Sequence, residues 1–190
     1  MDMPVDIYRH TLSIGGTGML RFASLKLASC SARFTSVART RSSLSRLDDA
    51  LGNCSTRHHQ LQLNWSHSDD FLAQIEKHAS NTELPDLVVA WIHDDQLTLR
   101  LAQNLAEMGM VSYFFHIIGS ATVNPEKIAG TLLDAFDPPP NLAYHQVILG
   151  AQDTGYRSRW LTDQEISEGV LEAIRRMDAQ FVVGTLDRYK

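Results

Sequence analysis

The chain is poor in cysteine, with Cys30 and Cys54 alone among 190 residues. The two cysteines show neither a disulfide framework nor a metal-ligand spacing, so we expect reduced thiols in a cytoplasmic protein. No stretch approaches the roughly 18 consecutive apolar residues that a membrane-spanning helix needs. Residues 1–10 also lack the apolar segment of a signal peptide. These absences predict a soluble protein without a membrane partner.

An excess of positive charge is absent too. The net charge of −5 argues against nucleic acid as a partner, because binding to phosphates requires clustered cations. The eight histidines are scattered, and no His, Asp or Glu set has metal-ligand spacing, so we expect no metal. A Gly-x-Ser-x-Gly elbow, the mark of one class of serine nucleophile, is missing as well.

Short apolar runs alternate with segments of helical periodicity about six times along the chain. Such alternation predicts an α/β fold: a single doubly wound, Rossmann-like domain with about seven mostly parallel strands and helices on both faces. The domain spans 1–190, with 1–10 as an N-terminal extension. The expected strands are 11–14, 33–40, 58–65, 87–92, 110–119, 144–150 and 180–186. The expected helices are 19–28, 42–51, 69–78, 97–108, 124–136 and 161–177, with linker-like stretches at 137–141 and 151–156.

A dense glycine cluster follows the first expected strand, in the segment "SIGGTGML". Glycine permits positive φ and close approach of a pyrophosphate, and the next helix offers free amides to the anion. Gly15, Gly16, Thr17 and Gly18 therefore predict a dinucleotide-binding turn, the alternative being a tight turn without a ligand. Arg21 stands where such turns usually carry a third glycine, and either points outward or helps to hold a phosphate.

The end of the second expected strand decides between cofactors. Folds specific for NAD place an acid there, whereas this chain has Arg39, Thr40 and Arg41 and no acid until Asp48. Arginines suit a 2′-phosphate, so NADP(H) is favoured over NAD(H). The alternative is that both arginines are exposed cations at a helix start. After the third strand, Asn64–Trp65 offers an amide and a flat ring to an adenine.

Few residues are candidates for acid–base work. His93 lies at the carboxyl end of the fourth strand, where Asp94 or Asp95 could orient its imidazole. Alternatively, His93 enters the next helix and one of the aspartates is its N-cap. Tyr144, which begins the sixth strand, is a second catalytic candidate if it reaches the crevice rim. His116 lies inside an apolar strand and is predicted to be a satisfied core histidine.

The segment "GYRSRWLTD" follows the sixth strand and combines two arginines with a tryptophan. Arg157 and Arg159 are expected to clamp an acidic group of a small-molecule substrate, and Trp160 to cover the site. The alternative is a loop in which Trp160 and Leu161 pack against the helix start. A capping box, Thr162 to Glu165, begins that helix.

Five segments together, "IGGTGML", "DLVVAWIH", "FHIIGS", "YHQVILG" and "SRWLTDQEISEGVLEAI", resemble small bacterial short-chain dehydrogenase/reductase-like proteins. The resemblance runs from about Ser13 to about Thr185. It implies a Rossmann fold, a nicotinamide dinucleotide cofactor and a homodimer formed through helices that flank the sheet.

The resemblance also places the residues of the superfamily's cofactor site on this chain. The basic residue of NADP-preferring members falls on Arg39, and the adenine-side position falls on Asn64. A serine that follows the fifth strand falls on Ser120, which is a candidate for binding substrate during catalysis. The remaining cofactor contacts fall on Gly15, Gly16, Thr17, Gly18, Met19, Leu20, Ala90, Trp91 and Ile92, with His93 next to them.

One departure from the superfamily concerns catalysis directly. Its members use Tyr-x-x-x-Lys on the helix after the fifth strand, and here Val123 stands four residues before Lys127. Two hypotheses follow. The chain is an NADP(H)-dependent oxidoreductase of atypical site that acts on a small metabolite, or it is a non-catalytic dinucleotide-binding sensor or scaffold that acts through a protein partner.

Overall fold

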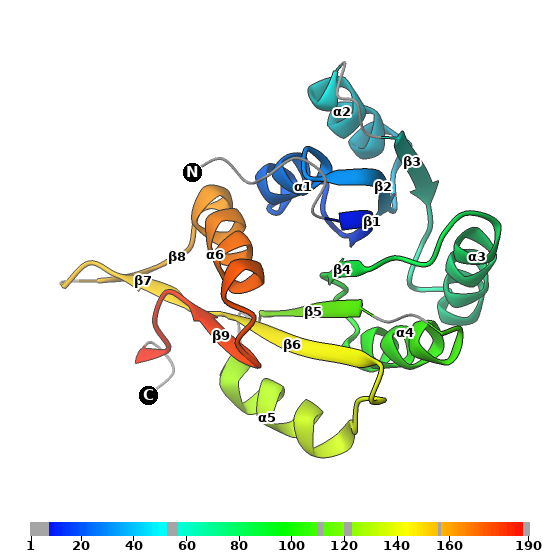
Figure 1. Ribbon diagram of the computed structural model, residues 1–190. Coiled ribbons are helices and arrows are strands. Elements are labelled where there is room, and N and C mark those ends of the chain that lie inside the picture. Colours follow the sequence, from blue (N-terminus) through cyan, green and yellow to red (C-terminus); the bar gives the residue numbers. More distant parts are fainter. Residues whose placement is uncertain (1–7, 53–56, 110–111, 120–122, 156, 188–190) are drawn as a thin grey trace.

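A computed structural model describes residues 8–52, 57–109, 112–119, 123–155 and 157–187. Seven parallel strands form its central sheet: Tyr8–Ile14 (β1), Ser31–Ala38 (β2), Arg57–Gln62 (β3), Leu87–Ala90 (β4), Ser112–Gly119 (β5), Leu142–Leu149 (β6) and Gln180–Val183 (β9). The strand order is β3-β2-β1-β4-β5-β6-β9 (Figure 1). The order changes direction beside β1, so the ligand crevice of such a fold lies beyond the carboxyl ends of β1 and β4.

Six helices cover both faces of the sheet, as the alternation predicts. They are Arg21–Ala28 (α1), Arg41–Leu51 (α2), Ser68–Asn81 (α3), Asp95–Glu107 (α4), Pro125–Ala135 (α5) and Asp163–Arg176 (α6). Helices α1, α2 and α6 pack on one face, and α3, α4 and α5 on the other (Figure 1). None of the helices in the described ranges is long and apolar enough to cross a membrane.

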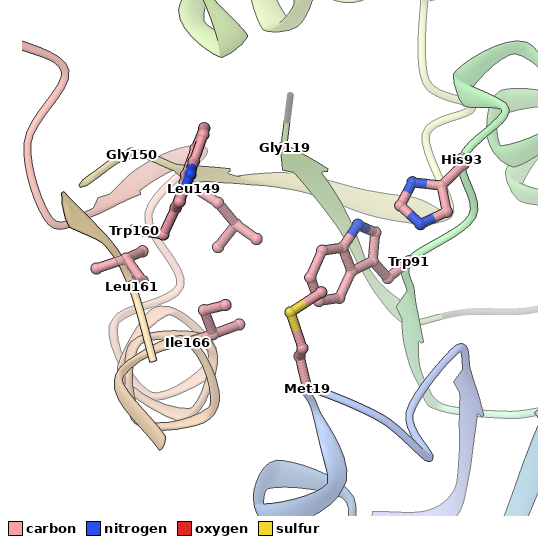
Figure 2. A pocket seen from close by; sticks show the side chains of 9 residues that line it. All are labelled: Met19, Trp91, His93, Gly119, Leu149, Gly150, Trp160, Leu161 and Ile166. Carbon is pink, nitrogen blue, oxygen red and sulfur yellow. The ribbon is translucent and has the colours of Figure 1, made fainter. Parts of the chain in front are cut away.

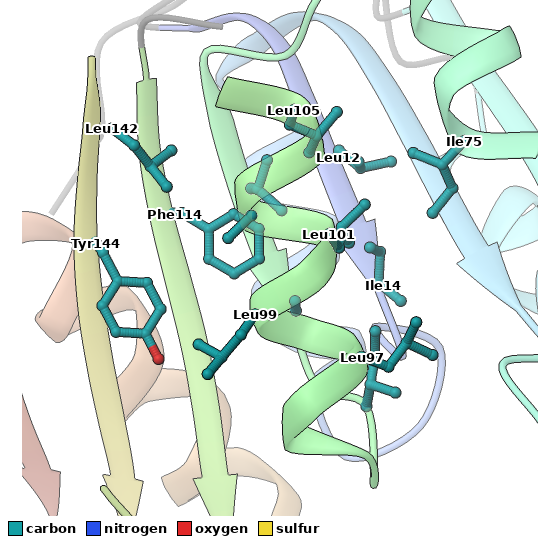
Figure 3. Packing of buried hydrophobic residues seen from close by; sticks show 14 of the residues in the cluster. Leu12, Ile14, Ile75, Leu97, Leu99, Leu101, Leu105, Phe114, Leu142 and Tyr144 are labelled. Carbon is teal, nitrogen blue, oxygen red and sulfur yellow. The ribbon is translucent and has the colours of Figure 1, made fainter. Parts of the chain in front are cut away.

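The hydrophobic core lies in two layers, one on each face. On the α4 face, Leu12 and Ile14 of β1 meet leucines of α4 and Ile75 of α3 (Figure 3). All four residues of β4 are buried, because this strand lies in the middle of the sheet with helices on both sides. The continuous apolar run of the sequence there is the pattern of a strand buried on both faces.

Strand β1 begins at Tyr8, three residues earlier than expected, so residues 8–10 belong to the sheet and not to an extension. Tyr8 is buried in the core on the α1 face. The start of β1 was not predicted from the sequence, because the polar side chain of His10 interrupts the apolar pattern of the strand. Its ring is buried and hydrogen-bonded to Thr35 and to the carbonyl of Glu83.

Of the stretch expected to be a linker at 151–156, the described residues 151–155 belong to a hairpin. Ala151–Asp153 (β7) pairs antiparallel with Ser158–Trp160 (β8). The Thr154 amide donates to the Arg157 carbonyl at 3.1 Å, and Gly155 has φ +81°. Strands of three residues are too short to show a period of two, which explains why the pattern was missed. The hairpin carries Trp160 to the crevice.

Candidate functional site

The turn between β1 and α1 is fixed against the end of β4. Gly15 has φ +75°, a conformation that residues with a side chain rarely adopt. A Cβ atom at this position would collide with the backbone carbonyl of Trp91. The Trp91 amide donates to the Ile14 carbonyl at 2.9 Å, and the Gly15 amide donates to the Val37 carbonyl at 3.0 Å. The turn is thereby held to the strands on both sides.

Two buried serines, Ser13 and Ser24, stabilise the same turn through hydrogen bonds on its core side. The Ser24 hydroxyl donates to the Gly16 carbonyl at 2.8 Å and shares a 3.0 Å hydrogen bond with the Ser13 hydroxyl. A Cβ atom at Gly16 would collide with both hydroxyls. Sequence reasoning missed these serines, although a polar residue on the buried face of a short helix is a usable signal. Their hydrogen bonds fix the backbone of the turn.

The other side of the turn is open. A Cβ atom at Gly18 would meet nothing within 4 Å. Within the described part of the chain, the backbone amides of residues 16–20 donate to no acceptor. The Leu20 side chain is buried in the core, so only its backbone is available to a ligand. Arg21 points outward, where its guanidinium donates to the Arg46 carbonyl at 3.3 Å.

A cavity of about 330 Å³, called the turn cavity below, lies over this open side. Arg39 and Trp65 meet in it, with the guanidinium carbon 5.0 Å from the centre of the indole. Thr40 is the N-cap of α2 and accepts a hydrogen bond from the Ser43 amide. The cavity is lined by Gly15, Thr17, Gly18, Met19, Ala38, Arg39, Thr40, Ser43, Trp65, Trp91 and His93.

Asn64 and Arg41, both expected beside the nucleotide, do not line the turn cavity. The Asn64 side-chain oxygen accepts from the Ser66 amide at 3.1 Å and closes its own turn. Arg41 lies in the first turn of α2 and lines a separate hollow with His58 and His59. Both departures arise because β2 and β3 end earlier than expected, at Ala38 and Gln62.

A second cavity of about 250 Å³, called the apolar cavity below, lies beyond the ends of β5 and β6. Figure 2 shows the side chains around it. They come from the glycine turn, the ends of β4, β5 and β6, the end of hairpin strand β8 and the start of α6. The lining residues are Met19, Trp91, His93, Gly119, Leu149, Gly150, Trp160, Leu161 and Ile166. Of these described residues, His93 is the only histidine, and no Asp, Glu, Lys, Arg, Tyr or Cys is among them.

His93 is exposed at the junction of both cavities, but neither neighbouring aspartate orients it. The Asp94 carboxylate caps α4 by accepting from the Leu97 amide at 2.9 Å. The Asp95 carboxylate lies 3.0 Å from Nε2 of His116. The structure therefore supports the alternative in which an aspartate is the helix cap. The His93 ring faces the Trp91 indole, with 6.0 Å between ring centres.

Tyr144 lies in the core, contrary to the expectation of a catalytic role. Its hydroxyl shares a 2.7 Å hydrogen bond with Nδ1 of His116, and its residue is 9% exposed. It lies five positions before Leu149, the last residue of β6, or roughly 16 Å from the crevice. Burial raises the pKa of the Tyr144 hydroxyl. His116 is fully buried with both ring nitrogens bonded, as expected of a satisfied core histidine.

Other residues expected at the site are placed as follows. Ser120 lies outside the described residues. Ala90 and Ile92 are buried, so their side chains belong to the core while their backbones border the crevice. Val123 and Lys127 line a third hollow between α4 and α5 and do not reach either crevice cavity.

The loop before α6 does not provide the expected arginine clamp. Arg159 is bound to Glu165 through two 2.8 Å hydrogen bonds and donates to the Trp160 carbonyl. The hydrogen bonds from Arg159, followed by those from Thr162, lower the pKa of the Glu165 carboxyl to about 2. Arg157 lines neither cavity. Trp160 does line the apolar cavity, 45% exposed, where it covers one side of the opening.

Leu149, Leu161 and Ile166 line the apolar cavity although nothing in the sequence marked them as site residues. In the sequence they are indistinguishable from ordinary core residues. They line the cavity because Leu149 ends β6, and Leu161 and Ile166 lie just before and within the start of α6. Among the described residues, no three His, Cys, Asp or Glu side chains are grouped so as to hold a metal ion.

No family model matches the sequence. No curated protein matches it at a significant level either. Solved structures do match over nearly the whole chain. An alcohol dehydrogenase from the archaeon Thermococcus sibiricus, complexed with 5-hydroxy-NADP, gives a TM-score of 0.69 at 15% identity, covering 96% of this chain and 97% of that chain.

Two further matches are dehydrogenases of the same architecture. A short-chain dehydrogenase from Sphingobium yanoikuyae in complex with NADPH gives a TM-score of 0.65 at 14% identity, covering 92% of this chain and 87% of that chain. The bulky-bulky ketone specific alcohol dehydrogenase from Comamonas testosteroni gives 0.65 at 14% identity, covering 92% and 85%. At these identities the matches establish the fold, which is the doubly wound Rossmann-like fold expected from the sequence.

Proposed function

We propose that the chain binds NADP(H) along the crevice, with the adenosine end in the turn cavity and the nicotinamide end toward the apolar cavity. One juxtaposition carries this proposal: the open side of the glycine turn and Arg39 line the same cavity. Free amides at residues 16–20 suit a pyrophosphate, and the cation at the end of β2 suits a 2′-phosphate. Gly18 leaves room for the backbone to approach an anion.

Arg39 and Trp65 fit the two parts of a phosphorylated adenosine. The guanidinium lies over the indole face, which holds its plane and leaves its edge donors for a phosphate. The indole offers a flat surface to the base. The Sphingobium enzyme, whose fold matches, was solved in complex with NADPH, which supports this choice of cofactor.

Bound NADP(H) supplies or accepts a hydride, and the chain must then move a proton. His93 is the candidate, because it is exposed at the junction of the cavities, and an imidazolium can donate a proton to a forming alkoxide while a neutral imidazole can accept one from an alcohol. The apolar lining favours an uncharged carbonyl compound or alcohol as the substrate. We therefore propose an oxidoreductase of atypical site, in which His93 replaces the absent tyrosine and lysine pair.

One observation favours the alternative of a non-catalytic sensor or scaffold. His93 has no carboxylate to orient it, since Asp94 and Asp95 are bound elsewhere. Without such a partner, the imidazole is less fixed in position and in tautomer. The two functions share the nucleotide site and differ only in turnover.

Titration calorimetry with NADPH and NADH tests the cofactor proposal. We expect wild-type protein to prefer NADPH, and Arg39→Ala to bind the two nucleotides equally. Gly18→Val should keep the fold, because its side chain enters open space, and lose both nucleotides. Absence of binding at high micromolar nucleotide would reject the proposal.

Oxidation of NADPH by a panel of apolar aldehydes and ketones tests catalysis. We expect His93→Ala to lower turnover at saturating NADPH by about 100-fold. His67→Ala is the control, since His67 is an exposed histidine that precedes α3 and lines neither cavity. Nucleotide binding without turnover of any member, or turnover unchanged in His93→Ala, would favour the sensor or scaffold.

A further inference from the structure

Three residues line both cavities: Met19, Trp91 and His93. Met19 comes from the glycine turn, whereas Trp91 and His93 follow β4. In Figure 2 the Met19 side chain points toward the Trp91 indole, and the His93 ring lies on the far side of that indole. These side chains therefore stand between the turn cavity and the apolar cavity, across the path that an extended dinucleotide takes.

The backbone that carries this partition is fixed. The Trp91 amide donates to Ile14, and its carbonyl packs against Gly15 so closely that no side chain fits there. On the other side, the buried Ser167 hydroxyl of α6 donates to the Met19 carbonyl at 2.9 Å. The distance between the two chain segments is thus set by hydrogen bonds, and only side-chain rotation can widen the passage.

The side chains themselves are free to rotate. Met19 is 42% exposed and unbranched, with three rotatable bonds and a thioether that packs readily on an aromatic ring. Trp91 is half-buried and His93 is exposed. Side chains that stand between the two cavities favour a ligand that needs one cavity over a ligand that needs both.

We infer that Met19 and Trp91 are specificity-determining residues that set how long a nucleotide the crevice accepts. The inference rests on the proposed nucleotide site. The turn cavity alone takes a bisphosphorylated adenosine. A dinucleotide reaches the apolar cavity only when the contact between Met19 and Trp91 opens, so its apparent affinity is reduced by the fraction of molecules that are open.

The test compares adenosine 2′,5′-bisphosphate with NADPH in titration calorimetry on the full chain. Met19→Ala removes one wall of the passage and leaves Trp91 in place. We expect this variant to bind NADPH about five-fold more tightly and the bisphosphate as wild type does. Met108→Ala, a change at the far end of α4, is the matched control and should alter neither affinity.

A kinetic measurement gives a second readout. In Trp65→Phe/Trp160→Phe protein, Trp91 is the one tryptophan left and can be excited selectively at wavelengths that tyrosine does not absorb. NADPH should quench it at a rate that levels off at high concentration, because opening precedes entry. Adding Met19→Ala should remove that limit. The bisphosphate, which needs only the turn cavity, should change the signal at a rate that rises linearly with concentration in both proteins.

The outcomes separate the two proposals. If neither ligand binds wild-type protein, the proposed nucleotide site is rejected and the partition with it. If both bind and Met19→Ala changes the two affinities by the same factor, or changes neither, the nucleotide site stands and the role of Met19 and Trp91 is rejected.

Discussion

Polar groups lie both at the carboxyl-terminal edge of the sheet and at its amino-terminal part. The two regions differ in whether these groups have hydrogen-bond partners within the protein. At the amino-terminal part, His10 is 1% exposed and both its ring nitrogens have partners. At the carboxyl-terminal edge, the amides of residues 16–20 have no acceptor in the described chain, and Arg39 and His93 face a cavity.

The hydrogen bonds at the amino-terminal part form one directed chain. The Glu83 carbonyl can only accept, so Nδ1 of His10 carries the proton, at 2.5 Å. Nε2 of neutral His10 then accepts from the Thr35 hydroxyl at 2.8 Å. The Thr35 oxygen in turn accepts from Nε2 of His78 at 3.0 Å. Each of these contacts has a donor and an acceptor, so both ring nitrogens of His10 are satisfied.

This difference in hydrogen bonding indicates which residues contribute to folding stability and which are available to bind a ligand. Polar groups that satisfy one another contribute to the free energy of folding, whereas groups left without partners at a cavity are available to a ligand. Variants at the two regions should therefore change different measurements.

The largest effect is expected at Gly15. Gly15→Val forces a branched side chain into φ +75° and against the Trp91 carbonyl, and should lower the free energy of unfolding by about 4 kcal/mol or more. Urea denaturation measures this loss. Gly18→Ala, in open space, is the control and should unfold as wild type does. Equal stability of both variants would show that the turn is not held as described.

A pH effect comes next, at the amino-terminal part. Burial lowers the pKa of His10 from 6.5 to about 4. The unfolded chain then binds more protons between these values, so stability is complete above pH 6.5 and falls as the pH drops toward 4. We expect a loss of about 2 kcal/mol between pH 7.5 and pH 5 from this group.

The control for that pH effect is His10→Gln, which keeps a donor and an acceptor but does not titrate in this range. It should reduce the pH slope measured by denaturation at each pH. The neighbouring titratable and charged groups are His78, His59, Arg33 and Asp86. The pKa values of His78 and His59 are lowered too, mainly by burial, so part of the slope should survive. An unchanged slope would assign the effect to other groups.

A matched pair of hydroxyl deletions compares the two regions directly. Ser24→Ala removes the support of the glycine turn, and Thr35→Val removes the link between His10 and His78. Each should cost about 1–2 kcal/mol of folding free energy, because buried partners lose a hydrogen bond. Only Ser24→Ala should also weaken NADPH binding, by a few-fold. A similar loss of affinity in Thr35→Val would remove the separation between the regions.

The turn cavity was the more predictable of the two cavities. Its chemistry lies in short segments next to strand ends, such as Gly15–Gly18 and Arg39, so local pattern was enough to find it. The apolar cavity depends on Leu149, Leu161 and Ile166, whose type is that of any core residue. Their role follows from contacts between distant segments, and the hairpin that completes the cavity has strands too short for periodicity.

Pairing between side chains more than one helical turn apart in the sequence also explains the site residues that sequence reasoning misplaced. Asp95 is bound to His116 and Arg159 to Glu165, and an isolated sequence does not show which charged partner a side chain will find. The helix cap at Thr162 was found because its hydrogen bonds join residues three apart.

The smallest effect is expected at Arg159. Its ion pair with Glu165 is exposed to solvent, so Arg159→Ala should lower the melting temperature only slightly, and less at high salt. The pKa of Glu165, held at about 2 mainly by this arginine, should rise toward its usual range, as a carboxyl NMR titration would show. Arg157→Ala, the control, should leave that pKa unchanged. Neither variant should alter substrate affinity, because neither side chain lines the two cavities. If Arg159→Ala alone raised the KM for an anionic substrate, Arg159 would bind that substrate as the sequence suggested.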